Sequence, residues 1–316
     1  MANFTWTFDA PTGTYKSHAM SNKLWEASVS NSVFMDHVRP IDGFGRKQGE
    51  TVTLVRVANV TEPTSAQLQE AVRIPEDDFS LSTTTITVQE LGRSIPYTSL
   101  SMDLSKFDLE NPIQKKLREQ MRLTLDTMAA GAFKTASVKY VPLTPTTNSI
   151  TTNGTPGGTA ASNMNMFHVE EIRDYMYDTL HVPPLEGDDY IGIFRTRGLR
   201  GIKRDPDWEE WHKYTDPTVK FNGEVGRIES VRFIETNHSQ ALGFSGTADV
   251  LGEGVVFGDD AVAMAEAMTP ELRAAIPGDF GRAKAVAWYG ILNFGIIWNT
   301  GNPGEAKIMH VTSLPV

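Results

Sequence analysis

The sequence NPIQKKLREQMRLTLDTMAAGAFKTASVK, from Asn111 to Lys139, decides the fold because it predicts one long helix. Asn111 offers an N-cap oxygen, and Pro112 stands at the first helical position, where a backbone N–H is not needed. At ~1.5 Å per residue the helix would be about 40 Å long. On its polar side we expect Arg122 and Asp126 to pair one turn apart. The apolar residues recur at steps of three and four, which places them on one helical face: Ile113, Leu117, Met121, Leu125, Met128, Ala132 and Ala136.

Two strand-like segments precede this helix. ETVTLVRVANV (Glu50 to Val60) and FSLSTTTITVQELGRSIPYT (Phe79 to Thr98) are rich in β-branched residues. The polar residues 61–78 between them form a longer connection than compact domains usually have. We therefore expect a long hairpin. Because a two-stranded hairpin alone is marginally stable in water, we expect it to lie on another surface.

The N-terminal region predicts an arm. Phe4, Trp6 and Phe8 alternate with polar residues, which indicates an extended segment with one aromatic edge. A frayed terminus is the alternative. Residues 21–36, SNKLWEASVSNSVFMD, predict a short helix, and Pro40 and the glycines after it end this helix in turns.

Downstream of the long helix, residues 141–163 (VPLTPTTNSITTNGTPGGTAASN) predict a linker and an internal boundary. Phe167 to Leu180 and the basic residues 196–204 predict further helices. Strand-like segments alternate with these without a βαβ rhythm, which favours an α+β fold over a doubly wound parallel sheet. The expected strands are Tyr190–Phe194, Gly226–Thr236, Val255–Phe257, Lys284–Trp298 and Lys307–Thr312.

Composition excludes several classes of function. Lys plus Arg number 29 against 39 Asp plus Glu, so the net charge of −10 argues against a dedicated nucleic-acid binder. The chain has 0 cysteines, which excludes disulfides, thiol catalysis and thiolate metal sites. The first residues do not resemble a secretory signal. The most apolar stretch, Ala285 to Trp298, is shorter than the ~20 residues of a membrane-spanning helix, so we expect a soluble protein without a membrane partner.

Motifs for catalysis are missing from the sequence. The seven histidines form no HExxH or similar metal pair, and no GxSxG elbow ties a serine to a base. The glycine pairs at 43/45 and 252/254 lack the spacing of phosphate-binding loops and are interpreted as turns. We therefore predict that the chain is not an enzyme, and we assign no catalytic, cofactor-binding or metal-ligating residue and no cofactor.

Two charged groups leave alternatives open. The paired acids Asp188-Asp189 and Asp259-Asp260 could bind a cation, although turn and capping roles are commoner for such residues. A basic run could contact phosphate, pair with acids of a neighbouring copy, or form a solvated helix face. This run consists of Arg195, Arg197, Arg200, Lys203 and Arg204.

The order of segments along nearly the whole chain resembles the major capsid protein family typified by the coliphage N-four. The series begins with SNKLWEASVSNSVF, KQGETVTLVRVANV and TITVQELGRSIPYTSLSMDLSKFDLENPI. Its most specific part is HVPPLEGDDYIGIFRTRGLRGIKRDPDWEEWHKYTDPTVKFNGEVGRIESVRFIETNHS, which includes the turn Gly223-Glu224-Val225-Gly226. VVFGDDAVAMAE and Trp288-Tyr289-Gly290 complete it. The resemblance implies the Hong Kong 97-type fold of tailed-bacteriophage capsids.

The resemblance also implies a role for each part of the chain. Residues 1–40 would be the N-terminal arm, and 41–100 the extended E-loop that lies over a neighbour. Residues 101–164 would form the peripheral domain with the long spine helix and the linker. Residues 165–281 would form the axial domain, and 282–316 would return to the peripheral domain.

The implied function is assembly. Copies would form the pentamers and hexamers of an icosahedral head, in the virion, around double-stranded DNA that is not bound sequence-specifically. Because the arm starts within a few residues of Met1, we expect a separate scaffolding protein. The resemblance also implies a portal and a decoration protein as partners. We expect assembly in the host bacterial cytoplasm and a shell held by noncovalent contacts. The alternative is an encapsulin-type nanocompartment that encloses enzyme cargo.

Overall fold

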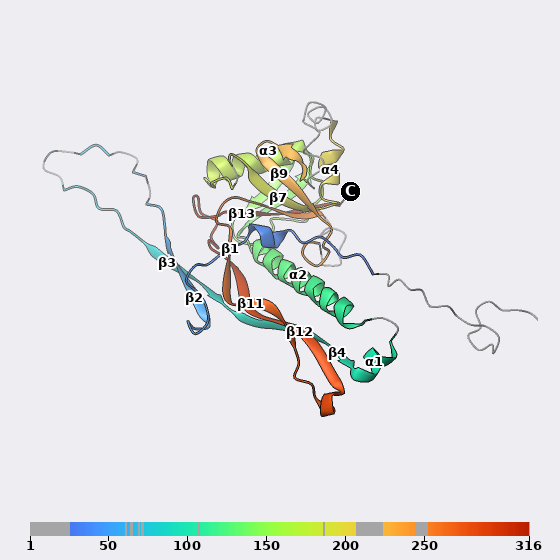
Figure 1. Cartoon of the computed structure of the whole chain (residues 1–316). Coiled ribbons are helices and arrows are strands. Elements are labelled where there is room, and N and C mark those ends of the chain that lie inside the picture. The colour runs from blue at the N-terminus through green and yellow to red at the C-terminus, as the bar shows by residue number, and fades with distance from the viewer. Residues whose placement is uncertain are drawn as a thin grey trace, which may run out of the picture.

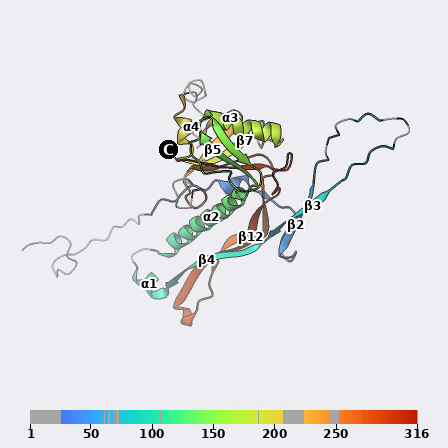
Figure 2. The same cartoon turned by 180° about the vertical axis from the view of Figure 1, so that it is seen from behind.

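The structure is a computed structural model that describes residues 26–60, 62–63, 66–68, 70, 73–105, 108–185, 187–206, 224–243 and 252–315. The aromatic arm at residues 4–8, the start of the helix predicted at 21–36, and residues 207–223 of the most specific part of the resemblance lie outside these residues. Figures 1 and 2 show a body built on one sheet, a second sheet crossed by a long helix, and a hairpin that projects to one side.

The long helix is confirmed as α2 (Glu110–Lys134). It begins one residue earlier than predicted, and Asn111 is not its N-cap. Instead, Asp108 accepts the backbone N–H of Glu110 at 3.1 Å and the side-chain amide of Asn111 at 2.6 Å. The helix ends before the predicted Lys139, because Val138 already belongs to a buried strand.

One face of α2 covers a four-stranded sheet. Leu117 of the helix shares a core cluster with Val286 and Trp288 of the sheet, and Leu125 and Phe294 belong to a second shared cluster. The strand order is β1 (Arg39–Pro40), β11 (Val262–Ala274), β12 (Ala283–Ile296) and β4 (Gln89–Thr98). The strand predicted at Lys284–Trp298 is therefore confirmed as β12, whereas β11 was not predicted.

The second sheet is mixed and has seven strands, in agreement with an α+β fold. Pairs β5–β13 and β7–β9 are parallel, and the remaining pairs are antiparallel. The helices that accompany this sheet are α3 (Met166–Asp174), which continues into the π-helical turn η2 (Tyr175–Thr179), and α4 (Arg200–Lys203). The strand order is β6 (Thr147–Thr151), β5 (Val138–Thr144), β13 (Ile308–Ser313), β10 (Gly252–Phe257), β7 (Tyr190–Arg195), β9 (Val231–Thr236) and β8 (Glu224–Ile228).

Three predicted segments are corrected. The linker expected at 141–163 overlaps most of the hairpin β5–β6, whose strands pair around a turn at 145–146. The single strand predicted at 226–236 is two strands, with a turn at Glu229 and Ser230, both of positive φ. Residues 26–33 have no regular structure, and only the 3₁₀ turn η1 (Phe34–His37) follows, so the helix predicted at 21–36 is wrong in its described part.

The predicted hairpin is confirmed in its first half. β2 (Thr51–Val57) and β3 (Leu81–Thr87) pair antiparallel from Thr51↔Thr87 to Val57↔Leu81. After Val88, however, the chain continues as β4, which pairs with β12 of the four-stranded sheet. The run predicted at 79–98 is thus two strands, and only the first projects from the body (Figure 1).

The predicted domain boundaries do not coincide with the boundaries between sheets. Residues 138–151 lie in the seven-stranded sheet and not with the spine helix. β11, inside the range 165–281, lies in the four-stranded sheet. The range 282–316 is divided between the two sheets. β12 lies beside α2, whereas β13 lies inside the seven-stranded sheet, where it pairs with β10 on one side and β5 on the other.

Candidate assembly surfaces

The base of the hairpin is anchored to the body by alternating side chains. Val52 and Leu54 of β2 and Ile86 of β3 point inward and share a small core cluster with Ala263 and Ala265 of β11. Arg56 continues this inward face and is buried. Because successive side chains of a strand point to opposite faces, one face of the hairpin base packs against the body and the other face points away from it.

Arg56 holds the base of the hairpin to the body by polar contacts. Its guanidinium donates to the side chain of Asn299 at 3.0 Å and to the backbone oxygen of Ile297 at 3.4 Å. It also lies over the ring of Trp298, with 5.3 Å between the guanidinium carbon and the ring centroid. Such a cation–π contact contributes about 0.5–2 kcal/mol. The hairpin is therefore positioned at its base, although its distal part extends away from the body.

The outer part of the hairpin carries exposed apolar side chains. Burial of such side chains against another surface would contribute about 1.5–3 kcal/mol each. Clusters of this kind in soluble proteins mark interaction sites. Within the described residues, the exposed large apolar side chains of this segment are Val55, Val57, Val60, Leu68, Ile74, Phe79 and Leu81.

A second apolar group lies at the far end of the four-stranded sheet. The helix α1 (Ser99–Leu104) exposes Leu100 and Leu104 there. Beside it, the turn between β11 and β12 exposes Ile276 and Phe280, and the 3₁₀ turn η5 (Asp279–Gly281) forms its tip. The two apolar groups thus lie on separate parts of the molecule, because the hairpin projects to one side and the β11–β12 turn forms the lower end (Figure 1).

A buried carboxylate joins three parts of the chain. Asp126 of α2 accepts the backbone N–H groups of Val33 and Phe34 at 2.9 and 2.8 Å. Its second oxygen lies 3.0 Å from Nδ1 of His238, which follows β9. The predicted pairing with Arg122 is therefore wrong. This carboxylate fixes where the N-terminal segment crosses the long helix.

The signal for this junction was present in the sequence. Asp126, Ala129, Ala130 and Phe133 are spaced by three and four residues, and all are buried. They widen the predicted apolar stripe, so Asp126 lies on a covered face. A carboxylate in such a position needs several hydrogen-bond donors.

A second buried network joins the end of α2 to the seven-stranded sheet. Glu253 accepts from Nε2 of His310 at 2.8 Å, from Lys134 at 3.1 Å and from the backbone of Gly243 at 2.5 Å. Lys139 lies 3.3 Å from Nδ1 of His310 and donates to the backbone oxygen of Lys134 at 2.7 Å. A neutral His310 with its proton on Nε2 satisfies both contacts of its ring.

The pKa values of this network follow from burial and from its charges. Burial would raise the pKa of Glu253, but the hydrogen bonds from His310 and Gly243 and the charge of Lys134 hold it below 4.5. Burial lowers the pKa of His310 below 6.5, and Lys139 adds to this effect against the hydrogen bond to Glu253. Both groups therefore resist protonation in the folded chain.

The predicted basic run is divided by the structure. Arg195 donates to the backbone oxygen of Leu242 at 2.7 Å, and Lys203 pairs with Glu235 at 2.7 Å. Arg197, Arg200 and Arg204 are exposed around α4. Of the predicted run, therefore, two members serve the fold and three lie on the surface.

Three of the four paired acids have structural partners. Asp189 is buried and pairs with Arg227 at 2.6 Å and Arg232 at 2.9 Å. Asp260 pairs with Arg39, and Asp259 accepts the backbone N–H of Asp260 at 2.9 Å. Within the described residues, no cluster of three acidic or histidine side chains is arranged to hold a metal ion. No helix among them has the length and hydropathy to cross a membrane.

Sequence comparisons find no relatives. No protein-family model matches the chain, and no curated protein sequence matches it.

Solved structures, in contrast, match along the whole chain. The head structure of Helicobacter pylori bacteriophage KHP40 is 13% identical, covers 99% of both chains and has a TM-score of 0.73. The acid-stable capsid of Helicobacter pylori bacteriophage KHP30 is 12% identical, with 99% of this chain and 100% of that chain covered and a TM-score of 0.70. The capsid of Cyanophage Pam1 is 15% identical, with the same coverage and a TM-score of 0.69.

These matches establish the fold. The chain has the fold of tailed-phage capsid proteins, the Hong Kong 97 type. The finer resemblance to the N-four family stays a prediction.

Proposed function

We propose that this chain is the major capsid protein of a tailed bacteriophage and works by assembly and not by catalysis. Copies of it would form the pentamers and hexamers of an icosahedral head around double-stranded DNA. The observation that carries the proposal is the fold match to phage heads and capsids over 99% of this chain.

The exposed apolar groups support assembly. A two-stranded hairpin is marginally stable alone, and the outward face of this one displays Val55, Val57 and Leu81. At the turn between β11 and β12, Ile276 and Phe280 are also exposed. Neighbouring copies would cover both groups, and their burial would offset the repulsion between chains of net charge −10.

Domain roles follow from the sheets. We assign the four-stranded sheet and α2 to the peripheral domain, and the seven-stranded sheet with α3 and α4 to the axial domain around the five-fold and six-fold axes. β2, β3 and the segment between them would be the E-loop, and residues 1–40 the N-terminal arm. This proposal differs from the ranges predicted from sequence, 41–100, 101–164, 165–281 and 282–316.

The proposed partners are other copies of the chain, a scaffolding protein, a portal and a decoration protein. The protein would reside in the virion after assembly in the host bacterial cytoplasm. It would enclose DNA without reading its sequence. The exposed Arg197, Arg200 and Arg204 would meet DNA or a neighbouring subunit.

The experiment is to express the chain, alone and with its scaffolding protein, and to image the product by negative-stain electron microscopy. We expect closed particles of uniform size. A monomer that is ordered throughout and unaffected by dilution in both preparations contradicts the proposal.

The encapsulin alternative is not favoured, because the matching structures described above are phage heads and capsids. Absorbance of intact native particles at 260 against 280 nm separates the two: DNA-filled heads absorb more strongly at 260 nm, and protein-filled compartments at 280 nm.

A further inference from the structure

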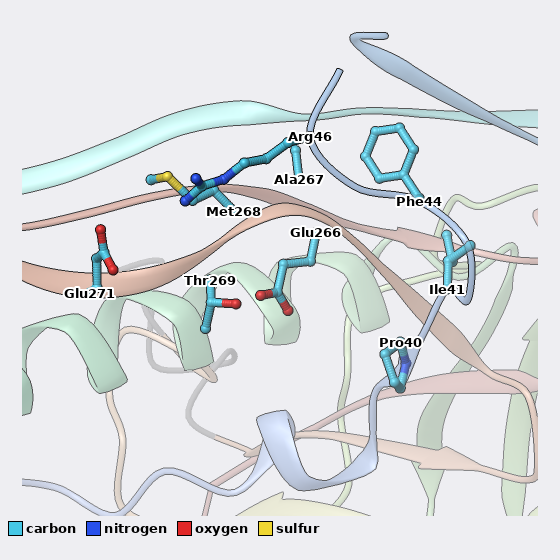
Figure 3. Close-up of a pocket in the computed structure, with 9 residues that line it drawn as sticks. All are labelled: Pro40, Ile41, Phe44, Arg46, Glu266, Ala267, Met268, Thr269 and Glu271. Atoms are coloured by element: carbon cyan, nitrogen blue, oxygen red, sulfur yellow. The ribbon is translucent and has the colours of Figure 1, made fainter. Parts of the chain in front are cut away.

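We propose that Phe280, at the tip of one copy, inserts into a pocket beside β11 of a second copy. This inference rests on the proposed function and specifies one contact of the shell. The pocket lies between the segment that follows β1 and the irregular middle of β11 (Figure 3).

The tip is built to display Phe280. Asp279, Phe280 and Gly281 have φ values of 47°, 51° and 89°, so two consecutive non-glycine residues are left-handed. Such backbone is strained, and strained residues cluster at functional sites. Ser99 holds this conformation by donating its hydroxyl to the backbone oxygen of Gly281 at 2.8 Å and its N–H to that of Arg282 at 3.0 Å. The Phe280 side chain is fully exposed.

The pocket is open because β11 loses its neighbour. β1 pairs with β11 only as far as Pro40↔Met264. Beyond this point, β1 no longer covers the edge of β11. The register of β11 against β12 then shifts twice, between Glu266 and Met268 and between Met268 and Glu271. Bulges of this kind redirect side chains and terminate pairing.

Apolar side chains from two segments line this pocket. Pro40 belongs to β1, Ile41 and Phe44 to the segment after it, and Met268 to β11. In Figure 3, Arg46 extends along β11 toward Met268. The pocket volume of about 420 Å³ lies within the ~300–1,000 Å³ range of ligand pockets, which is large enough for an aromatic side chain.

The charges of the tip and pocket are complementary. The charged residues that line the pocket are Arg46, Glu266 and Glu271. Glu271 pairs with Arg273 at 2.8 Å, whereas no ion pair within the described residues involves Arg46 or Glu266. The tip carries Asp279 and Arg282, which are exposed and only 3.6 Å apart. A docked tip would bring Asp279 to Arg46 and Arg282 to Glu266. This complementarity selects a second copy of the chain as the occupant.

Phe280 does not reach the pocket of its own chain. The pocket lining ends at Glu271, whereas the tip lies beyond the bridge Gly278↔Ala283 of the same hairpin. Seven extended residues span roughly 23 Å at ~3.3 Å per residue. The contact therefore joins different surfaces on two copies, which generates rings or extended lattices and not an isolated symmetric pair.

The test uses the absence of cysteine from the chain. Phe280→Cys and Phe44→Cys variants are assembled together, oxidised and separated on a non-reducing gel. We expect a disulfide-linked dimer in the mixture and only traces with either variant alone. A matched control mixes Phe280→Cys with Val57→Cys, which is exposed on the hairpin and outside the pocket. Met268→Cys provides a second pocket position in case Phe44→Cys fails to assemble.

The outcomes are distinct. Particles that give no dimer above the Val57→Cys control overturn the inference and leave the proposed function standing. Dimers of Phe280→Cys alone would show that tips meet tips, which also overturns it. Failure of the unaltered protein to form particles, alone and with its scaffolding protein, refutes the proposed function and this inference with it.

Charge reversal gives an independent measurement. Arg46→Glu is expected to lower particle yield about tenfold, because like charges would meet at the contact. Adding Asp279→Arg in the same chain is expected to restore the yield. A double variant no better than Arg46→Glu contradicts the proposed pairing.

Discussion

Ile86 packs onto the backbone of Gly295, where an added Cβ would come within 2.8 Å of its Cγ1. This close approach packs β3 against β12. The side-chain amide of Asn293 also donates a hydrogen bond of 2.7 Å to the backbone oxygen of Thr87. The hairpin base is therefore part of the body, and the exposed apolar part begins beyond it.

Replacing Gly295 by Val should displace the hairpin base. Overpacking of this kind typically lowers the free energy of unfolding by about 1–3 kcal/mol, and limited proteolysis of the hairpin should become faster. Gly278→Ala is the matched control, because an added Cβ there meets nothing within 4 Å. The second change Ile86→Ala should partly restore protease resistance. Equal digestion of the Gly295 and Gly278 variants would show that the contact is unimportant.

Asp126→Asn should loosen the junction of the N-terminal segment with α2. The carboxylate accepts two backbone N–H groups and contacts His238. Its replacement by an amide should lower the free energy of unfolding by about 1.5–3 kcal/mol. Hydrogen exchange should become faster at the amides of Val33 and Phe34. The exposed Asp178→Asn is the control and should change stability by less than about 0.5 kcal/mol. Unchanged exchange at both amides would contradict this role.

Acidification should destabilise the fold through His310 and Glu253. Both folded-state pKa values lie below their ordinary values of 6.5 and 4.5. The unfolded chain therefore binds more protons below about pH 6.5 for His310 and below about pH 4.5 for Glu253, so stability falls as pH falls. In His310→Gln, the amide can still donate to Glu253 and accept from Lys139.

For this variant, the melting temperature should decrease less between pH 7.5 and 5.5 than for the unaltered protein. Between pH 7.5 and 8.5, where neither group titrates, the difference between the two proteins should be constant. An identical acid-induced decrease in both proteins would exclude His310 as the cause.

A charge on the outer face of the hairpin should block assembly without unfolding the subunit. Val55 points outward and is exposed, so Val55→Asp should change stability by less than about 0.5 kcal/mol. Particle yield, measured by sedimentation, should nevertheless fall, because the charge would be buried against a neighbour. Thr179→Asp, at the exposed end of η2 and outside the hairpin, is the control and should leave the yield unchanged. The idea fails if Val55→Asp assembles as well as the unaltered protein.

Elements whose apolar or β-branched pattern lies within one continuous segment could be predicted from the sequence. The apolar stripe of α2, the β-branched runs of β2 and β3, and the apolar run of β12 fall into this group. β11 was missed because VAMAEAMTPELRA is rich in helix-forming Ala, Met and Glu. Its pairing with β12 overrides that propensity. The hairpin β5–β6 was missed because its Thr- and Pro-rich sequence resembles a loop.

The polar junctions could not be predicted in the same way, because their partners are distant along the chain. Asp126 meets His238, and Glu253 meets His310, only after two sheets and a helix are in place. Local spacing can show that Asp126 lies on a buried face, but not which donors surround it. The exposed Phe280 depends likewise on three left-handed residues that no sequence motif marks.

The four-stranded sheet and α2 form only two layers, and this sets the thickness of any enclosure built from them. A helix about 10–12 Å across on a sheet layer of about 10 Å gives a wall of roughly 20 Å. In the proposed head, such a wall would be one subunit thick. Tension from tightly packed contents would therefore run within the plane of the wall, through whatever joins one copy to the next.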